Sequence, residues 1–307
     1  MRRVRQQIGC PSDQSGWDGT GITIAVLDSG VGYHPDLVGR ILGFRDFVGG
    51  QELLYDDNGH GTHVCGILCG SGKLSAGGFR GMASGAKIVM GKVLDKSGSG
   101  STEHMLEGLD WILRVRERYR VRILNISVGI GSLEDKAKER LLQEKVEQVW
   151  DSGILVVCAA GNKGPGEGTI SDIGGCGKVI TVGCHDGDYH RNQAGLCENY
   201  SGRGKQNSIP PKPDLVAPGT NIVSCNVNYR EKNGRVWNAY IGKSGTSMAT
   251  PIVSGAAALA FQAYSGMSHE ECRDKLLYTA EDLRLPWNQQ GWGMVNVGRL
   301  LGGVRTT

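Results

Sequence analysis

The chain contains several apolar runs that each end in small or polar residues. Five of these runs are short enough to be buried strands, and they cover residues 22–27, 86–94, 122–128, 154–160 and 178–183. Segments with apolar residues at helical spacing lie between and after them, the clearest at 102–119, 133–152 and 268–277. Runs without polar alternation are typical of strands that are buried on both faces of a sheet. The sequence therefore predicts an α/β protein.

The length and net charge of the chain restrict how many domains and which partners we expect. With 307 residues and 39% hydrophobic content, the chain can bury one sizeable core. No proline-rich, low-complexity or charged linker divides it, so we expect one domain. The formal net charge of +3 gives no reason to expect nucleic acid or a membrane surface as a partner. The oligomeric state stays open.

Residues 242–255 join a cluster of small residues to a predicted helix. Ser244, Gly245, Thr246 and Ser247 precede an apolar run at helical spacing, and hydroxyl residues are common at helix starts. A serine there faces the positive end of the helix dipole, and its own backbone N–H is free to bind a developing negative charge. Ser247 is therefore a candidate nucleophile, although a serine at a helix start is usually only a cap.

Two further stretches carry groups that would complete such a site. Asp28 directly follows the apolar run 22–27, which places a carboxylate at the end of a buried strand. His60 lies at a predicted loop-to-helix junction. An aspartate, a histidine and a serine on separate loops can converge as orienting group, general base and nucleophile.

These stretches resemble three motifs of the subtilisin-like serine proteases, the subtilases. Residues 26–31 match the aspartate motif, 60–66 the histidine motif and 245–251 the serine motif, in the order of that family. The resemblance implies hydrolysis of peptide bonds through an acyl-enzyme, with Asp28, His60 and Ser247 as the catalytic triad. No cofactor takes part in this chemistry.

The resemblance also implies a fold. Similar segments run from about residue 21 to about residue 298, so we expect a single catalytic domain over 1–307 with an N-terminal extension at 1–20. The implied architecture has three layers, α/β/α, with a mostly parallel central sheet.

Other residues match family positions that bind substrate. Asn162 matches the asparagine that donates to the oxyanion of the tetrahedral intermediate. By itself, this asparagine would only indicate a turn. Peptide substrate is expected to pair through backbone groups with segments that match the family's binding strands, namely Ser97, Gly98, Ser99, Gly100, Ser127, Val128, Gly129, Ala160 and Gly161.

Two departures from relatives bear on the pocket for P1, the residue just before the cut. Lys163 stands where a well-studied secreted relative carries a glutamate at the pocket rim, and Asp172 stands where relatives usually have a proline. A cation at the rim disfavours lysine and arginine at P1 by a modest, salt-screened amount. We therefore expect a preference for neutral or apolar P1 residues.

A structural calcium site common in relatives is expected to be absent. The residue that matches Asp36 helps bind this ion in many of them, together with a loop past the histidine helix. Here that loop, residues 71–83, lacks the carboxylate and amide oxygens that calcium prefers. Other calcium sites remain open. Cys65 and Cys69 share a helix face near His60, but their spacing matches no zinc site, so we expect no metal there.

Cysteine usage and the N-terminus both favour a cytoplasmic protein. The nine cysteines are odd in number, and Cys65, Cys69 and Cys158 lie in apolar runs as buried thiols would. The basic residues at the N-terminus are not followed by the apolar segment of a secretory signal, and no stretch is long enough to span a membrane. The alternative is a secreted protein whose signal and prosegment are removed.

Two other functions remain compatible with these motifs. An acyl-enzyme can be intercepted by an amine, which would make the protein a peptide transacylase or macrocyclase. The same fold can also serve as a non-catalytic binding scaffold, but none of the four chemical positions is altered here as such a role would suggest.

Overall fold

A seven-stranded sheet forms the centre of the molecule. The computed structural model describes residues 1–10, 16–128, 136–187, 189 and 196–302. All neighbouring strands of this sheet are parallel. Their spatial order is β2 (Ile41–Asp46), β3 (Lys87–Lys92), β1 (Thr23–Asp28), β4 (Val121–Ile126), β5 (Leu155–Ala159), β6 (Ile180–Cys184) and β7 (Leu215–Ala217).

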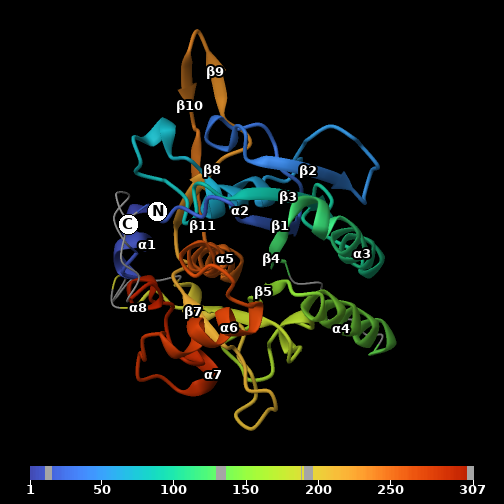
Figure 1. Cartoon of the computed structure of the whole chain (residues 1–307), viewed down its shortest axis with the longest axis vertical. Helices are drawn as coiled ribbons and strands as arrows, with labels where there is room; N and C mark the ends of the chain where they lie inside the picture. The colour runs from blue at the N-terminus through green and yellow to red at the C-terminus, as the bar shows by residue number, and fades with distance from the viewer. Residues whose placement is uncertain (11–15, 129–135, 188, 190–195, 303–307) are drawn as a thin grey trace.

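Helices cover both faces of the sheet. In Figure 1, α2 (His60–Cys69) and α5 (Thr246–Ala263) lie on one side of the strands, whereas α3 (Thr102–Tyr119) and α4 (Lys136–Asp151) lie on the other. Every residue of β1, β5 and β6 is buried, which explains their uninterrupted apolar runs. The predicted three-layer α/β/α fold with a parallel sheet is confirmed.

Short elements complete the domain around this core. Next to α8 (Val297–Leu300) lies α1 (Arg2–Gln7), and the N–H of Val297 donates to the carbonyl of Ile8. The remaining helices are α6 (His269–Tyr278) and α7 (Trp287–Gln290). The remaining strands are β8 (Ile222–Cys225), β9 (Arg230–Lys232), β10 (Arg235–Trp237) and β11 (Tyr240–Lys243).

The helix predicted at residues 102–119 is observed with the same bounds, because the residues that end it lie directly beside it in the sequence. Ser101 accepts a hydrogen bond from the N–H of His104, and Arg120 takes a left-handed conformation after the last turn. The helix predicted at 133–152 is observed from Lys136 to Asp151, and residues 133–135 lie outside the described part of the chain.

The four short strands before α5 form two antiparallel pairs. Strand β10 pairs with β9, and β11 pairs with β8, so no turn joins β10 to β11 directly. The turn lies instead at Asn233 and Gly234, which both have positive φ, as a two-residue hairpin turn requires.

The order of the strands indicates where a ligand site of this sheet lies. From β1 the chain passes to β2 and β3 on one side, and then to β4, β5, β6 and β7 on the other. Ligands of open parallel sheets bind beyond the carboxyl ends of the strands where such a reversal occurs. Asp28 ends β1, and Ser127 follows β4, so both lie at this reversal.

Candidate active site

Asp28 is buried at the carboxyl end of the central strand β1. Its Oδ1 accepts the backbone N–H of Ser29 at 2.7 Å and lies 2.7 Å from Nδ1 of His60. Because a carboxylate only accepts, Nδ1 of His60 must carry the proton. This arrangement leaves Nε2 of the imidazole as the available base.

His60 is the first residue of α2, and its side chain is largely shielded from solvent. Burial by itself would lower the pKa of His60, but the charge and hydrogen bond of Asp28 outweigh it. The pKa of His60 is therefore raised above its ordinary value. Asp28 thus both orients the ring and stabilises its protonated form.

Asp56 builds the entrance to α2, and the sequence analysis did not identify it. Its Oδ1 accepts from the Ser29 hydroxyl and the Gly59 N–H, and its Oδ2 accepts from the N–H and hydroxyl of Thr62. The carboxylate therefore connects the residue after Asp28 to the first turn of the His60 helix. A polar residue four positions before a helix was the only signal for this role.

Lys92 is a fully buried cation beside the same loop. Its Nζ donates to the carbonyls of Ser29 and Leu94, at 2.8 and 2.7 Å, and to Oδ1 of Asp57 at 2.7 Å. All three donor positions of the ammonium are thus satisfied. A lysine inside the apolar run 86–94 was a signal that the sequence analysis left unused.

Ser247 occupies the first turn of α5, where its backbone N–H has no partner within the helix. Gly245 enters the helix with a φ of 141°, which disfavours other residues there. Among the described residues, no hydrogen bond joins the Ser247 hydroxyl to His60. The structure thus places Ser247 at a helix entrance, as predicted, and its side chain is partly exposed.

Asn162 lies beyond the end of β5, next to this helix entrance. Its Oδ1 accepts from both the N–H and the hydroxyl of Thr246, at 3.1 Å each. With the oxygen occupied in this way, the Nδ2 group remains as a donor. The amide of Asn162 and the N–H of Ser247 thus flank one turn, as two oxyanion donors would.

The segments expected to bind peptide are placed as follows. Asp95 Oδ1 accepts the N–H groups of Ser97 and Ser99 and so shapes the exposed turn that contains Gly98 and leads to Gly100. Ser127 and Val128 continue β4 and are buried, whereas Gly129 lies outside the described residues.

Ala160 and Gly161 are already engaged within the domain. The N–H of Ala160 donates to Val182, and its carbonyl accepts from Ser171, whereas the Gly161 carbonyl accepts from Gly202. A contact between these backbone groups and peptide would add to existing hydrogen bonds. The turn at Gly98 is engaged in the same way, since the Gly98 N–H donates to the Asp95 carbonyl and the Ser99 carbonyl accepts from the Asp95 N–H.

His63 links α2 to the segment that leads to Ser247. Its Nε2 lies 3.0 Å from both the Ile222 carbonyl in β8 and the Ile241 carbonyl in β11. Chiefly because of burial, the pKa of His63 is lowered to about 3, so the ring is neutral and Nε2–H donates to both carbonyls. Lys243, two residues after Ile241, acts electrostatically on His60 and lowers its pKa.

The cysteines include one disulfide that the sequence analysis did not predict, between Cys184 and Cys197. Cys65, Cys69 and Cys158 are buried free thiols, as predicted. Burial raises the pKa of each of these three thiols, so they are protonated near neutral pH. Buried protonated thiols are poor metal ligands.

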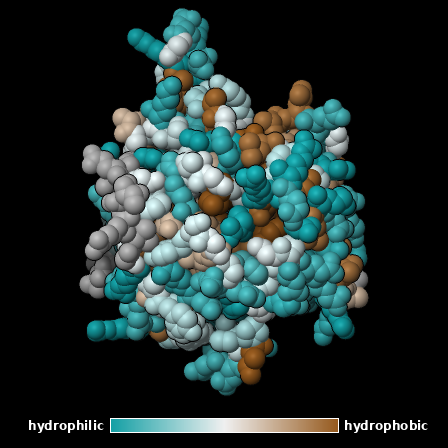
Figure 2. Space-filling model, viewed as in Figure 1, coloured by the Kyte–Doolittle hydropathy of each residue, from teal (hydrophilic) through white to brown (hydrophobic). Residues whose placement is uncertain are grey.

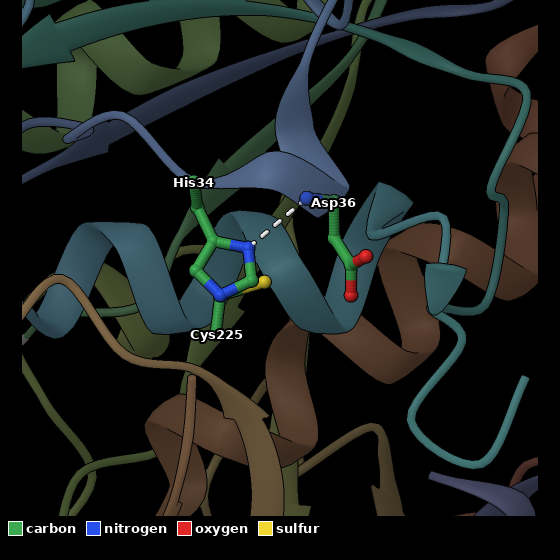
Figure 3. A group of neighbouring side chains, drawn as sticks. All are labelled: His34, Asp36 and Cys225. Carbon is green, nitrogen blue, oxygen red and sulfur yellow. Dashed lines mark hydrogen bonds between the residues drawn. The ribbon is translucent and has the colours of Figure 1, made fainter. Parts of the chain in front are cut away.

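Among the described residues, two groups of buried side chains lie close enough together to be considered as metal sites. In the first, His34, Asp36 and Cys225, the carboxylate of Asp36 points away from the ring of His34 (Figure 3). Both ring nitrogens of His34 are hydrogen-bonded, Nδ1 to the Asp36 N–H and Nε2 to the Ala239 carbonyl. This histidine therefore offers no free lone pair to a metal.

The carboxylate of Asp36 also has protein partners. Its Oδ1 accepts from the Ser71 hydroxyl and the Leu74 N–H, and its Oδ2 accepts from the Tyr240 hydroxyl at 2.6 Å. The second group contains Cys184, Asp186 and Cys197, but its two sulfurs form the disulfide. Neither group presents a ready set of ligands.

None of the described helices combines the length and apolar character needed to cross a membrane.

Comparison with known proteins agrees with this geometry. Residues 19–293 match the model of the subtilase family. Serine protease AprX of Bacillus subtilis (strain 168) is 40% identical over 84% of this chain, which spans only 61% of that relative. An intracellular serine protease of Paenibacillus polymyxa is 35% identical over 89% of this chain and 76% of its own length. The solved structure of sphericase superposes with a TM-score of 0.77 at 30% identity, covering 91% of this chain and 92% of that one.

Proposed function

The chain belongs to the subtilase family, and we propose that it is a serine endopeptidase that uses Ser247 as nucleophile, His60 as general base and Asp28 as orienting carboxylate. The observation that carries this proposal is the 2.7 Å contact of Asp28 with Nδ1 of His60, which leaves Nε2 free. Peptides or proteins are its substrates.

In the first step, Nε2 of His60 takes the proton of the Ser247 hydroxyl while its oxygen attacks the scissile carbonyl. The imidazolium that forms is stabilised by Asp28, which already raises the pKa of the ring. The same proton then passes to the departing amine, and an acyl-enzyme remains. Water, activated by the same histidine, hydrolyses this ester.

The negative charge on the carbonyl oxygen is bound by the Asn162 amide and the N–H of Ser247. The contact of Asn162 with Thr246 supports this role because it orients the amide without using Nδ2. Donors that are in place before reaction need no reorganisation in the transition state.

Substrate is bound mainly through its backbone, between the turn 97–100 and the segment 127–129. Lys163 is exposed beside Asn162, which supports the preference for neutral or apolar P1 residues. Selection by this cation falls as salt concentration rises.

No metal is proposed for the chemistry or for the site at Asp36. Three protein donors face its carboxylate, including the Tyr240 hydroxyl, and these take the place of a cation. We also propose a cytoplasmic location, supported by the intracellular serine protease among the relatives and by the buried free thiols; the Cys184–Cys197 disulfide is a feature that an oxidising compartment would favour.

The test is labelling with a fluorophosphonate, which reacts with an activated serine. Wild-type protein should be labelled and Ser247→Ala should not, and a peptide library should show hydrolysed products with neutral or apolar P1 residues. Products that are joined or cyclised instead of hydrolysed would establish the transacylase alternative. Absence of labelling in wild type would contradict the proposed function.

A further inference from the structure

The hairpin formed by β9 and β10 projects from the body of the protein. Figure 1 shows it at the top of the molecule, beyond all the other elements, and both of its strands are mostly exposed. Its turn, Asn233-Gly234, has the two positive φ values of a tight hairpin, so the projection has a defined shape. An exposed hairpin that contributes little to the core calls for an explanation outside folding.

One face of this hairpin gathers nearly all its charge. Directly opposed residues share a face of a strand pair, and so do alternate residues along each strand. Arg235 is opposite Lys232, and Trp237 is opposite Arg230, so these four residues form one face. We call them the basic face. The other face carries Glu231 opposite Val236.

The basic face is electrostatically unfavourable in isolation. Like charges directly opposite each other on a strand pair destabilise the pair, as Arg235 and Lys232 must. Among the described residues, none of the three cations forms an ion pair. Unfavourable local arrangements, such as two cations opposite each other, are found in proteins mainly at functional sites. A negatively charged partner would relieve the repulsion.

The base of the hairpin is fixed next to the catalytic histidine. A Cβ added at Gly32 would overlap a methyl group of Val227, and one added at Gly59 would lie 2.9 Å from another. Val227 therefore fills a notch between these glycines, and His60 follows Gly59 directly. Tyr229 packs edge-on against His34, with ring centroids 5.4 Å apart.

An apolar groove begins at the same notch. It is a cavity of about 200 Å³ that runs from Gly32 along Tyr33, Val38 and Leu54. These three side chains and Trp237 are between 47% and 67% exposed. Figure 2 shows hydrophobic side chains gathered below and to the right of the projecting end, over β2 and the loop that follows it.

We propose that the basic face and this groove together bind the departing half of a polypeptide substrate, the part on the C-terminal side of the cleaved bond. The partner chemistry that fits is an extended segment with an apolar side chain for the groove and acidic residues for the basic face. This inference rests on the proposed function, and it adds a substrate class to it.

The geometry favours the departing half over the acyl half. His60 must hand its proton to the departing amine, so that half of the substrate begins over the imidazole. The notch at Gly59 lies one residue from His60, and the groove leads away from it. The acyl half is already assigned to the segments 97–100 and 127–129.

The test compares a short substrate with a long one. The short substrate ends in a chromogenic amine directly after P1, and the long one has the same acyl part and about ten further residues with acidic and apolar side chains. The variants are the double charge reversal Arg230→Glu with Arg235→Glu, and Trp237→Ala. The control is Arg140→Glu on the exposed side of α4.

For the long substrate we expect kcat/KM to fall about tenfold in the double variant and about fivefold in Trp237→Ala, and the loss in the charge variant to shrink with added salt. For the short substrate, all variants should match wild type. Equal effects on both substrates, or no effect on either, would overturn the inference. Failure of wild type to cleave the short substrate would overturn the proposed function instead.

If the charge-reversed variant does not fold, the inference can be tested on wild-type protein by varying the charge of the residues that follow the cleaved bond. Wild-type kcat/KM should then rise for acidic extensions and not for basic ones of the same length. Equal rates for both extensions would overturn the proposal. Inhibition of wild type by an oligonucleotide, without any preference among peptide extensions, would assign the basic face to nucleic acid and also overturn it.

Discussion

The two halves of the proposed catalytic centre are held in different ways. Asp28 and His60 lie within a dense set of side-chain hydrogen bonds, to which Asp56 and Lys92 contribute from neighbouring elements. Ser247 lies on the first turn of a helix and is positioned mainly by the backbone of Gly245 and by the contact of Thr246 with Asn162. The base is therefore fixed before substrate arrives, whereas the nucleophile keeps freedom to turn toward it.

The largest expected effect tests whether the two halves act as one unit. Ser247→Ala and His60→Ala should each lower kcat by about 10⁶-fold, the size known for subtilisin in this same family, and the double variant should lose no more than either. A chromogenic peptide assay measures all three. A double variant far less active than both single variants would show that the halves act independently.

The second-largest effect is expected at Asn162, the proposed oxyanion donor beside Ser247. Asn162→Asp keeps an oxygen for Thr246 but removes the amide donor, so we expect kcat to fall by about 10²–10³-fold, again a value known from subtilisin, with KM little changed. Asn162→Ala removes both contacts and serves for comparison. If the aspartate variant kept full activity, Asn162 would be structural only.

Substitutions around Asp28 and His60 should lower stability as well as activity, because the side chains that position His60 also connect elements of the fold. Asp56→Asn turns an amide donor toward groups that are themselves donors, such as the Thr62 N–H, so we expect a loss of about 2 kcal/mol in the free energy of unfolding. It should also lower kcat about tenfold through misplacement of His60. Urea unfolding and peptide kinetics measure the two effects.

The matched control for this change is Asp151→Asn. Its carboxylate is exposed and paired with Lys178, and such surface pairs contribute little. A loss of stability in the control as large as that in Asp56→Asn would remove the proposed distinction between the two carboxylates.

The smallest expected effect lies in the pH profile. Only neutral His60 accepts a proton, so activity should rise with pH through its raised pKa. Lys243 lowers this pKa, so Lys243→Met should raise it and move the acid limb of kcat/KM to higher pH, leaving the plateau unchanged. Lys136→Met, which changes an exposed lysine at the start of α4, is the control. A shift to lower pH would contradict the prediction.

Features with local signals were predictable. The bounds of α3 follow from a serine cap and a residue at its other end that leaves the helix. Asp28 and Asn162 follow buried apolar runs, and the parallel sheet brings the ends of those runs to one edge. Such features depend on residues close together in the sequence, so periodicity and capping are enough to find them.

Features that join distant segments were missed. Asp56 lies 27 residues from Ser29, and nothing in either neighbourhood indicates their hydrogen bond. The disulfide of Cys184 with Cys197 and the pairing of β8 with β11 were equally hidden. In each case several partners were compatible with the pattern, and only the packed fold selects one.

The sequence by itself determined the fold class, the family resemblance and the identity of the candidate chemical groups, because apolar periodicity and short motifs are properties of neighbouring residues. The tertiary structure alone decided how those groups are supported and which surface lies beside them. The buried ammonium of Lys92 is held by contacts between segments far apart in the chain, and so is Val227 at the base of the hairpin, which packs against Gly59, the residue before His60. The free energy of such contacts depends on burial and orientation, which exist only once the chain has folded.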